Sequence, residues 1–337
     1  MSERIAIEAH ELTREFPGGV RALDGVSFAV EEGEIFGFLG RNGAGKSTTV
    51  RILTTLLRPT SGTATVLGHD VGKDPGSVRK VFGCALQEAA LDELMTGREH
   101  LHMAGRLVGL PKARASERAA ELLESFGLQA AADRIAAGYS GGMRRRLDVA
   151  MAMVRRPEVL FLDEPTTGLD PQGRRAVWDL VRGLRDEGST VFLTTQYLAE
   201  ADELSGRVAV VHEGRIAAIG TSEELKDRMG VTTIRVRVAP AESQAVTDAV
   251  RPSAVTAGAG GWLDIDVAGG EAAVPEVVRK LVGAGVAVER LRIQPPSLED
   301  VFVGLTGTEI EASTGGTDVG KITAVRRGLG VPMGPGG

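Results

Sequence analysis

The residues best suited to chemistry lie between Phe38 and Thr49. Residues 40–47 (GRNGAGKS) match the pattern G-x-x-x-x-G-K-[ST] in full, between a buried apolar strand and a helix. Glycines let backbone N–H groups turn inward around a phosphate, and the positive end of the following helix favours an anion. Lys46 would reach the β- and γ-phosphates, and the hydroxyl of Ser47 would bind Mg²⁺. The stretch therefore predicts a nucleotide phosphate loop.

Two other interpretations explain this loop less well. A glycine turn before an ordinary helix requires neither the lysine nor the serine, and both are present. A dinucleotide-binding turn built on Gly43 and Gly45 fails because Lys46 stands where the tight helix start belongs.

Two further apolar strands end in polar residues. Residues 159–162 (VLFL) lead into Asp163 and Glu164. Asp163 would hold Mg²⁺ directly or through water, and Glu164 would polarise an attacking water. An Asp-Glu pair is usually a solvated turn, but the apolar strand and the phosphate loop upstream argue against that. Residues 191–196 (VFLTTQ) end at Gln196 before a helix-like stretch, where a helix cap is the simplest interpretation for the segment alone.

The elements that must position these residues alternate between strand and helix. Strands are predicted at 5–12, 26–30, 34–39, 159–162, 190–194 and 207–211, and helices at 47–57 and 173–187. From Leu91 to Val154 the periodicity is helical, at 98–108, 112–126 and 142–154. This alternation favours a largely parallel sheet flanked by helices, with a helical subdomain at about 90–155.

A smaller domain follows the first. Its predicted elements are strands at 232–238, 262–267 and 286–293 and helices at 274–281 and 298–305, with Trp262 in the core. Residues from Thr306 onward contain no aromatic residue and much glycine, which is typical of a disordered tail. The predicted divisions are therefore 4–230, 231–305 and 306–337.

Composition limits the classes of function. The net charge of −6 argues against a nucleic-acid binder, and an exposed helix face explains the basic run Arg144–Arg146. The single cysteine, Cys84, is interpreted as a small buried hydrophobe, and the five histidines show no metal-ligand spacing. No apolar run approaches the ~18 residues of a membrane span. A soluble, cytoplasmic protein is expected, and any membrane role requires a partner.

Additional motifs resemble those of ATP-binding cassette (ABC) ATPases. Residues 139–143 (YSGGM) resemble the signature motif, Gln87 the Q-loop, and residues 167–170 (TGLD) the D-loop; Gln196 stands at the switch-histidine position. Order and spacing match across residues 4–225. The resemblance implies an α/β P-loop NTPase of the ABC type, with a mixed-sheet core, a helical subdomain and a small C-terminal α/β domain.

The resemblance also implies roles for residues that have simpler explanations. Ser140 would bind the γ-phosphate of ATP held by a second subunit, although such a serine is ordinarily a helix N-cap. Phe16 would stack on adenine, although a phenylalanine near a first strand is more often core. Gln87 would sense Mg²⁺ or water, the alternative being a solvated strand end. Asp170 belongs to the D-loop.

The implied site has three sets of residues. The catalytic set is Lys46, Glu164 and Gln196, and the metal set is Ser47, Gln87 and Asp163. The ATP-binding set is Phe16, Gly40, Asn42, Gly43, Ala44, Gly45, Lys46, Ser47, Thr48, Gln87, Ser140, Gly141, Gly142 and Asp170. Three positions depart from the family pattern: Arg41 replaces a common proline, Met143 the usual glutamine, and Gln196 the histidine.

One branch of the family resembles this chain most. Residues 139–146 (YSGGMRRR), 194–202 (TTQYLAEAD) and 295–302 (PPSLEDVF) resemble the daunorubicin-resistance type of drug-exporter ATPase, whose switch position is also glutamine. This implies ATP and Mg²⁺ as cofactors and an ATP-bound homodimer on two copies of a separate membrane permease. The location would be peripheral, at the cytoplasmic face of the membrane. Export of a drug, antibiotic or amphipathic metabolite is expected.

Three alternatives remain open. One is an ABC ATPase for a lipid or an ion. Another is a soluble ABC ATPase acting on ribosomes or nucleic acid. The third is a nucleotide-gated binding module that hydrolyses poorly because of Gln196.

Overall fold

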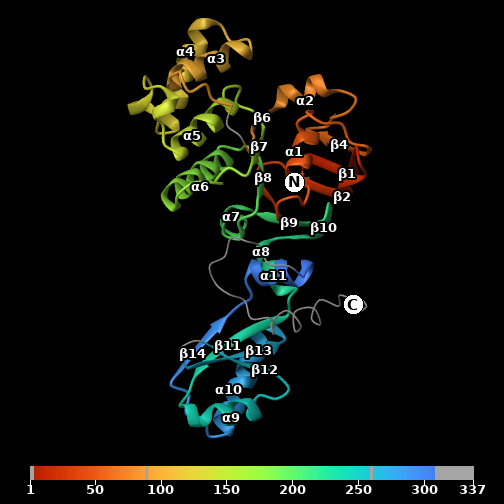
Figure 1. Ribbon diagram of the computed structural model, residues 1–337, viewed down its shortest axis with the longest axis vertical. Coiled ribbons are helices and arrows are strands. Elements are labelled where there is room, and N and C mark those ends of the chain that lie inside the picture. The colour runs from red at the N-terminus through yellow and green to blue at the C-terminus, as the bar shows by residue number, and fades with distance from the viewer. Residues whose placement is uncertain (1–3, 88–89, 259–260, 308–337) are drawn as a thin grey trace. The chain divides into compact units, whose positions relative to one another are not determined.

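The computed structural model describes residues 4–87, 90–258 and 261–307 (Figure 1). Contacts divide the chain into two units, the first ending at Ile219 and the second beginning at Gly220. The sequence pattern predicted this boundary at 230/231. It lies earlier because helix α8 (Ser222–Asp227) contacts helix α11 (Leu298–Thr306) of the second unit. Residues 308–337, most of the predicted tail, lie outside the described part.

A six-stranded sheet forms the centre of the first unit. Its order is β10-β9-β3-β8-β7-β6, and β3 is parallel to β8 and β9 while β7 is parallel to β6 and β8. The bounds are β3 (Ile35–Gly40), β6 (Phe82–Ala85), β7 (Val159–Asp163), β8 (Thr190–Thr195), β9 (Arg207–His212) and β10 (Arg215–Gly220). These pairings confirm the predicted parallel core. Strands β3, β7 and β8 are buried along their whole length, as is usual for parallel sheets.

A second, antiparallel sheet packs against this core. Its order is β2-β1-β4-β5, built from β1 (Ile5–Phe16), β2 (Val20–Glu31), β4 (Ser61–Val66) and β5 (His69–Asp70). Phe28 of β2 stacks on Phe36 of β3, with ring centroids 5.7 Å apart. The sequence pattern did not predict β4, because only its Ala64 and Val66 are apolar and buried. The two sheets give the mixed-sheet core that the family resemblance implied.

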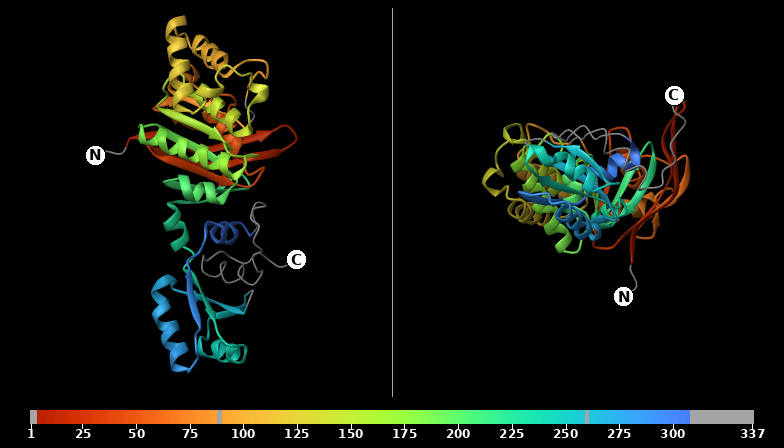
Figure 2. Two further views of the ribbon diagram at one scale, coloured as in Figure 1. Left: turned by 90° about the vertical axis from the view of Figure 1, so that its left-hand side faces the viewer. Right: turned by 90° about the horizontal axis from the view of Figure 1, so that it is seen from below.

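Helices complete the first unit. They are α1 (Lys46–Leu53), α2 (Pro75–Val81), α3 (Gly97–Leu107), α4 (Lys112–Ser125), α5 (Gly141–Ala152), α6 (Pro171–Asp186) and α7 (Leu198–Leu204). Helices α3 and α4 lie at the end of the unit farthest from β9 and β10 (Figures 1 and 2). Leu101, Leu122 and Leu147, from α3, α4 and α5, share one apolar cluster.

The second unit contains a four-stranded antiparallel sheet of order β12-β13-β11-β14. Its elements before α11 are β11 (Val231–Arg237), α9 (Ser243–Ala249), β12 (Ala254–Ala257), β13 (Trp262–Ala268), α10 (Val274–Gly283) and β14 (Arg290–Gln294). The prediction for Trp262 is wrong, because it is absent from the apolar cluster formed by the sheet, α9 and α10. Its ring instead lies 5.1 Å from the Arg292 guanidinium.

Candidate active site

Four adjacent parallel strands bring the predicted chemical residues to one edge of the central sheet. The pairs Leu39–Thr195, Asp163–Thr194 and Ala85–Leu162 show that β3, β8, β7 and β6 end at nearly the same level. The phosphate loop follows β3 and Gln196 follows β8. Asp163 and Glu164 lie at the end of β7, and Gln87 follows β6. Crevices at the carboxyl ends of such strands are the usual ligand sites of parallel sheets.

The backbone of the phosphate loop requires glycine at two positions. Gly43 and Gly45 have φ values of 82° and 105°, in the left-handed region that side chains rarely adopt. A Cβ atom on Gly45 would lie 2.6 Å from the Ala22 carbonyl oxygen, whereas one on Gly43 would meet nothing within 4 Å. Gly45 is therefore fixed by packing, while Gly43 leaves the mouth of the loop open.

The amine of Lys46 lies at the centre of this loop. Its side chain is almost fully buried, and Nζ donates hydrogen bonds to the carbonyl oxygens of Gly40 at 2.9 Å and Arg41 at 3.1 Å. The third partner of Nζ is Oε1 of Glu164, 3.0 Å away. This contact joins the phosphate loop directly to the acidic end of β7.

Glu164 is held in an uncommon backbone conformation. Its φ is 48°, and only 6% of its surface is exposed. Such a conformation costs free energy in a residue other than glycine and persists only where surrounding contacts fix it. Here the backbone N–H donates to Thr194 and the hydroxyl of Thr167 donates to Oε2 at 3.2 Å. The carboxylate is therefore pre-positioned.

Thr194 is a site residue that the sequence pattern did not single out. Its hydroxyl donates to Oδ1 of Asp163 at 2.5 Å and accepts from the backbone N–H of Glu164 at 3.1 Å. One side chain thus orients both acidic residues. A hydroxyl at the end of an otherwise apolar strand, beside the acidic strand, was the signal available for it.

The same strand end shows which residues make local structural bonds around Gln196. The hydroxyl of Thr195 accepts a hydrogen bond from the backbone N–H of Tyr197 at 2.9 Å, just before α7. Gln196 is half-buried, and among the described residues no hydrogen bond of its side chain is found. The N-cap residue of α7 is Tyr197 and makes no side-chain capping bond, so the helix cap that the isolated segment suggested for Gln196 is not found.

Ser140 and Asp170 are exposed and cap helices. The hydroxyl of Ser140 accepts from the backbone N–H of Met143 at 3.3 Å at the start of α5, as the simpler interpretation predicted. Asp170 caps α6 by accepting from the N–H of Gly173 at 2.8 Å. Within the described residues, no hydrogen bond joins either side chain to Lys46 or Glu164.

Phe16 and Gln87 also lie at the surface of the first unit. Phe16 ends β1, is half-buried, and lies under the Arg14 guanidinium at 4.7 Å from its ring centroid. It is absent from the apolar cluster around β1 and β2, so the core interpretation of this phenylalanine does not hold. Gln87 is exposed two residues after β6.

The basic run on α5 differs from the sequence prediction. An exposed helix face was predicted for Arg144–Arg146, but Arg145 is only 7% exposed and pairs with the buried Asp148 at 2.9 Å. Burial raises the pKa of the Asp148 carboxyl to about 6 despite this pair, and burial lowers the pKa of Arg145. Burying both charges costs free energy. Other contacts of this pair must therefore compensate that cost.

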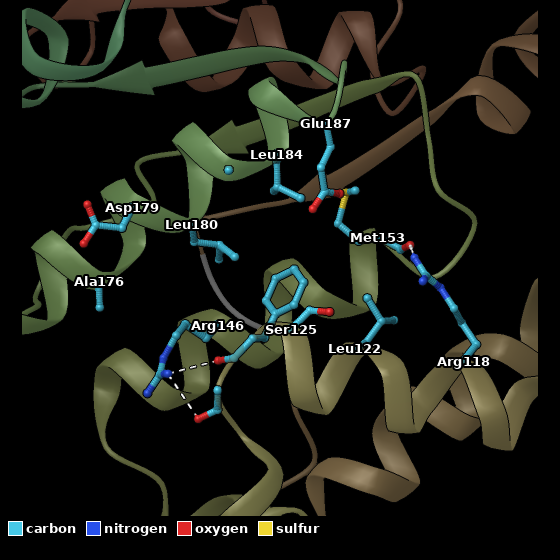
Figure 3. Close-up of a pocket in the computed structure, with 13 residues that line it drawn as sticks. Arg118, Leu122, Ser125, Arg146, Met153, Ala176, Asp179, Leu180, Leu184 and Glu187 are labelled. Atoms are coloured by element: carbon cyan, nitrogen blue, oxygen red, sulfur yellow. Dashed lines mark hydrogen bonds between the residues drawn. The ribbon is translucent and has the colours of Figure 1, made fainter.

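A groove of about 430 Å³ lies apart from this site, between helices α4, α5 and α6 (Figure 3). Its lining includes Leu122, Arg146 and Leu180, and none of the predicted catalytic, metal or ATP-binding residues.

The donors at the sheet edge fit a magnesium nucleotide. The predicted metal set offers the Asp163 carboxylate, the Ser47 hydroxyl and the Gln87 amide oxygen, and Mg²⁺ prefers oxygen ligands. In the described residues there is no cluster of three histidine, cysteine or acidic side chains suited to a metal ion. Mg²⁺ is commonly bound through one or two carboxylates together with substrate phosphates, and the Asp163 carboxylate at the end of β7 fits this mode of binding.

Phosphate loop, acidic strand end and inserted helical subdomain together define an ATPase of the ABC type. A family model of ABC transporters matches residues 23–167, and one described as "ATP-binding protein DrrA1-3-like, C-terminal domain" matches residues 220–306. The chain belongs to the family of ABC-transporter ATP-binding subunits that includes the daunorubicin/doxorubicin resistance ATP-binding proteins, and members of this family are ATPases.

Three comparisons show the extent of the likeness. The daunorubicin/doxorubicin resistance ATP-binding protein of Streptomyces peucetius is 47% identical, over 90% of this chain and 92% of its own. The linearmycin resistance ATP-binding protein of Bacillus subtilis is 37% identical, over 85% and 93%. A solved structure of the ATP-binding subunit of an ABC transporter is 29% identical with a TM-score of 0.60, covering 67% of this chain and 93% of that chain. No described helix has the length and apolarity needed to span a bilayer.

Proposed function

We propose that this chain hydrolyses ATP to drive export of a drug, antibiotic or other amphipathic metabolite through a separately encoded membrane permease. The observation that carries the ATPase part is the buried contact between Lys46 and Glu164, which joins the phosphate loop to the acidic strand end. The substrate class rests on the relatives named for resistance to daunorubicin, doxorubicin and linearmycin.

The buried residues have separate roles in the proposed reaction. The backbone N–H groups around Gly43 and Gly45 hold phosphate oxygens, and Lys46 neutralises their charge. Since Lys46 now bonds to Glu164, a bound γ-phosphate competes for the amine. The released Glu164 carboxylate can then accept a proton from the attacking water. Gln196 donates its amide N–H to the γ-phosphate.

Asp163, Ser47 and Gln87 would hold Mg²⁺. When bound, the ion neutralises charge on the β- and γ-phosphates. Thr194 keeps the Asp163 carboxylate oriented through its hydroxyl bond.

The exposed residues are proposed to act in a homodimer with two head-to-tail chains. Ser140 and the N–H groups of Gly141 and Gly142, at the positive start of α5, would bind the γ-phosphate held by the second copy. Asp170 would lie at the same interface, and Phe16 would stack on adenine. Two permease subunits and a position at the cytoplasmic face of the membrane complete the proposed assembly.

The test is ATP hydrolysis by the purified chain and by Glu164→Gln, followed by drug efflux from vesicles that contain the chain and its permease. Loss of hydrolysis in the variant with ATP still bound supports the proposal. Hydrolysis by the wild type that is no faster than by the variant, with both at background level, would instead support a nucleotide-gated binding module. Hydrolysis without any drug efflux would favour a lipid or ion transporter.

A further inference from the structure

We propose that Arg145 is a positioning residue for ATP hydrolysis. It ties α5, which begins at the signature serine Ser140, to the strand ends that carry Gln87 and Glu164. The inference rests on the proposed ATPase function and adds a residue that acts through the others.

The contacts of Arg145 reach two strands that are distant in sequence. At the end of β7, Nη2 donates to the carbonyl oxygen of Asp163 at 3.0 Å and Nε to that of Pro165 at 3.1 Å. At the end of β6, Nη1 donates to the Leu86 carbonyl at 2.6 Å and Nη2 to the Ala85 carbonyl at 3.4 Å. The four carbonyls flank Glu164 on one strand and precede Gln87 on the other.

The chemistry of this position suits arginine. The carboxyl ends of parallel strands leave carbonyl oxygens without ladder partners, and buried carbonyls without hydrogen bonds cost free energy. A guanidinium presents five N–H donors in a fixed plane, whereas a lysine ammonium is a point charge with three. One arginine can therefore bridge both strand ends and fix their separation.

Asp148 completes the arrangement from one turn further along α5. Its Oδ2 accepts from Nη1 of Arg145 at 2.9 Å, and only 8% of its surface is exposed. This contact compensates the buried positive charge and holds the guanidinium plane toward the strands.

The two neighbouring arginines provide an internal comparison. Arg144 donates to the carbonyls of Ala136 and Ala137, within the helical subdomain. Arg146 donates to the carbonyls of Phe126 and Gly127 at 3.0 and 3.3 Å, beside the groove between α4, α5 and α6 (Figure 3). Within the part of the chain that the structure describes, only the middle arginine of the run bonds to the ends of β6 and β7.

A kinetic signature follows from this geometry. Arg145 makes no hydrogen bond to the phosphate loop among the described residues, so its loss leaves Lys46 and ATP binding in place. Loss of Arg145 would instead shift the strand ends that hold Gln87 and Glu164, whose proposed roles belong to the chemical step. The effect therefore falls on kcat rather than on KM.

The experiment compares Arg145→Gln with Arg146→Gln in the full-length chain. Steady-state ATP hydrolysis, binding of a fluorescent ATP analogue and the unfolding midpoint are measured for each. We expect Arg145→Gln to lower kcat about tenfold or more with KM within about twofold, and Arg146→Gln to change both by less than about twofold. Arg145→Lys should recover part of kcat, because it keeps the charge and some donors.

A double variant separates positioning from general stability. If Arg145 positions Gln87, then Arg145→Gln has a much smaller effect on kcat in a Gln87→Ala background than in the wild type. Multiplicative effects in the double variant would contradict the role of Arg145 toward Gln87, and a kcat within about twofold of wild type in Arg145→Gln would contradict the inference as a whole. If Arg145→Gln does not fold, Arg145→Lys carries the same test.

The outcomes also separate this inference from the proposed function. Hydrolysis at background level in both the wild type and Glu164→Gln would overturn both. Normal kcat in Arg145→Gln beside an inactive Glu164→Gln would overturn the role of Arg145 alone.

Discussion

The proposed ATP site has a buried half and an exposed half, which differ in how their side chains are satisfied. The buried half consists of Lys46, Asp163, Glu164 and Thr194, whose polar atoms bond to one another and to backbone groups of the same unit. The exposed half consists of Gln87, Ser140 and Asp170, together with the half-buried ring of Phe16, at strand and helix ends.

The difference indicates which parts of the proposed ATP site depend on one chain and which depend on a second chain. The buried half is pre-organised within one chain, so under the proposed function it would bind phosphate and hold the base without a partner. The exposed half presents a helix N-terminus and an aromatic ring at the surface, and these gain strength only when another surface excludes water. The proposed second copy of the chain would supply that surface. Substitutions in the two halves should therefore have different consequences.

Substitution of Glu164 in the buried half should reduce hydrolysis more than any other change considered below. Glu164→Gln removes the proposed general base but keeps the side-chain volume, so hydrolysis should fall by about 10² or more while ATP binding persists. Phosphate release and binding of a fluorescent ATP analogue measure the two quantities. Glu158→Gln, an exposed glutamate just before β7, is the matched control. Unchanged hydrolysis in Glu164→Gln would show that the buried carboxylate is not the base.

A mixing experiment tests whether the exposed half acts on another chain. Lys46→Ala should abolish ATP binding at its own phosphate loop, and Ser140→Glu should place a negative charge where the γ-phosphate is proposed to lie. Each variant alone should be inactive. A mixture contains dimers with one intact composite site, so it should recover roughly a quarter of wild-type hydrolysis if a single site can turn over and the chains pair at random. No recovery at any mixing ratio would argue that Ser140 does not serve a second chain.

Gln196 directly follows β8 and is half-buried, and its substitution should have a smaller effect. A histidine can donate a charge-assisted hydrogen bond that is stronger than a neutral amide bond by about 1 kcal/mol. Gln196→His should therefore raise hydrolysis about fivefold at a pH where the imidazole is protonated. The gain should fall as the pH rises through the histidine pKa, whereas wild type lacks this step. An unchanged rate and pH profile would indicate that position 196 does not contact the phosphate.

Alkylation of Cys84 tests how closely solvent approaches the end of β6, near the exposed Gln87. Cys84 lies in β6 three residues before Gln87, and burial raises the pKa of its thiol from 9.0 to about 11. At pH 8 about one thiol in a thousand would be ionised, so alkylation by iodoacetamide should be slow and should rise about tenfold per pH unit below that pKa. Chain unfolded in guanidinium chloride is the control and should react quickly. Rapid labelling of the native chain would mean that the end of β6 opens to solvent.

Much of the buried half could be predicted from the sequence. The glycines, Lys46 and Ser47 of the phosphate loop and the acidic pair after 159–162 are local patterns, because strand, turn and helix follow one another along the chain. The strand ends they imply are present in the sheet. The phosphate loop and the acidic pair could also be predicted to lie close together, because the carboxyl ends of parallel strands meet at one edge of the sheet.

Other contacts depend on which strands become neighbours. Thr194 orients Asp163 because β8 pairs in register with β7, a register that no local pattern carries. Arg145 looked like part of an exposed basic face, because a run of three arginines does not show which guanidinium the packing will bury. Trp262 was assigned to a core for its size, but the pleat of β13 places it away from the apolar cluster of the second unit.

Residue types alone therefore set the chemistry of the site, because glycine conformation, charge and hydroxyl groups belong to them. Which residues support that chemistry depends on how the strands and helices pack. Strand order and helix packing set the distances between segments far apart in the chain, and hydrogen bonds such as those of Thr194 and Arg145 form only at those distances. Gln196 depends on both: its type sets the strength of the bond it can donate, and the fold leaves it half-buried after β8, with no side-chain hydrogen bond to any described residue.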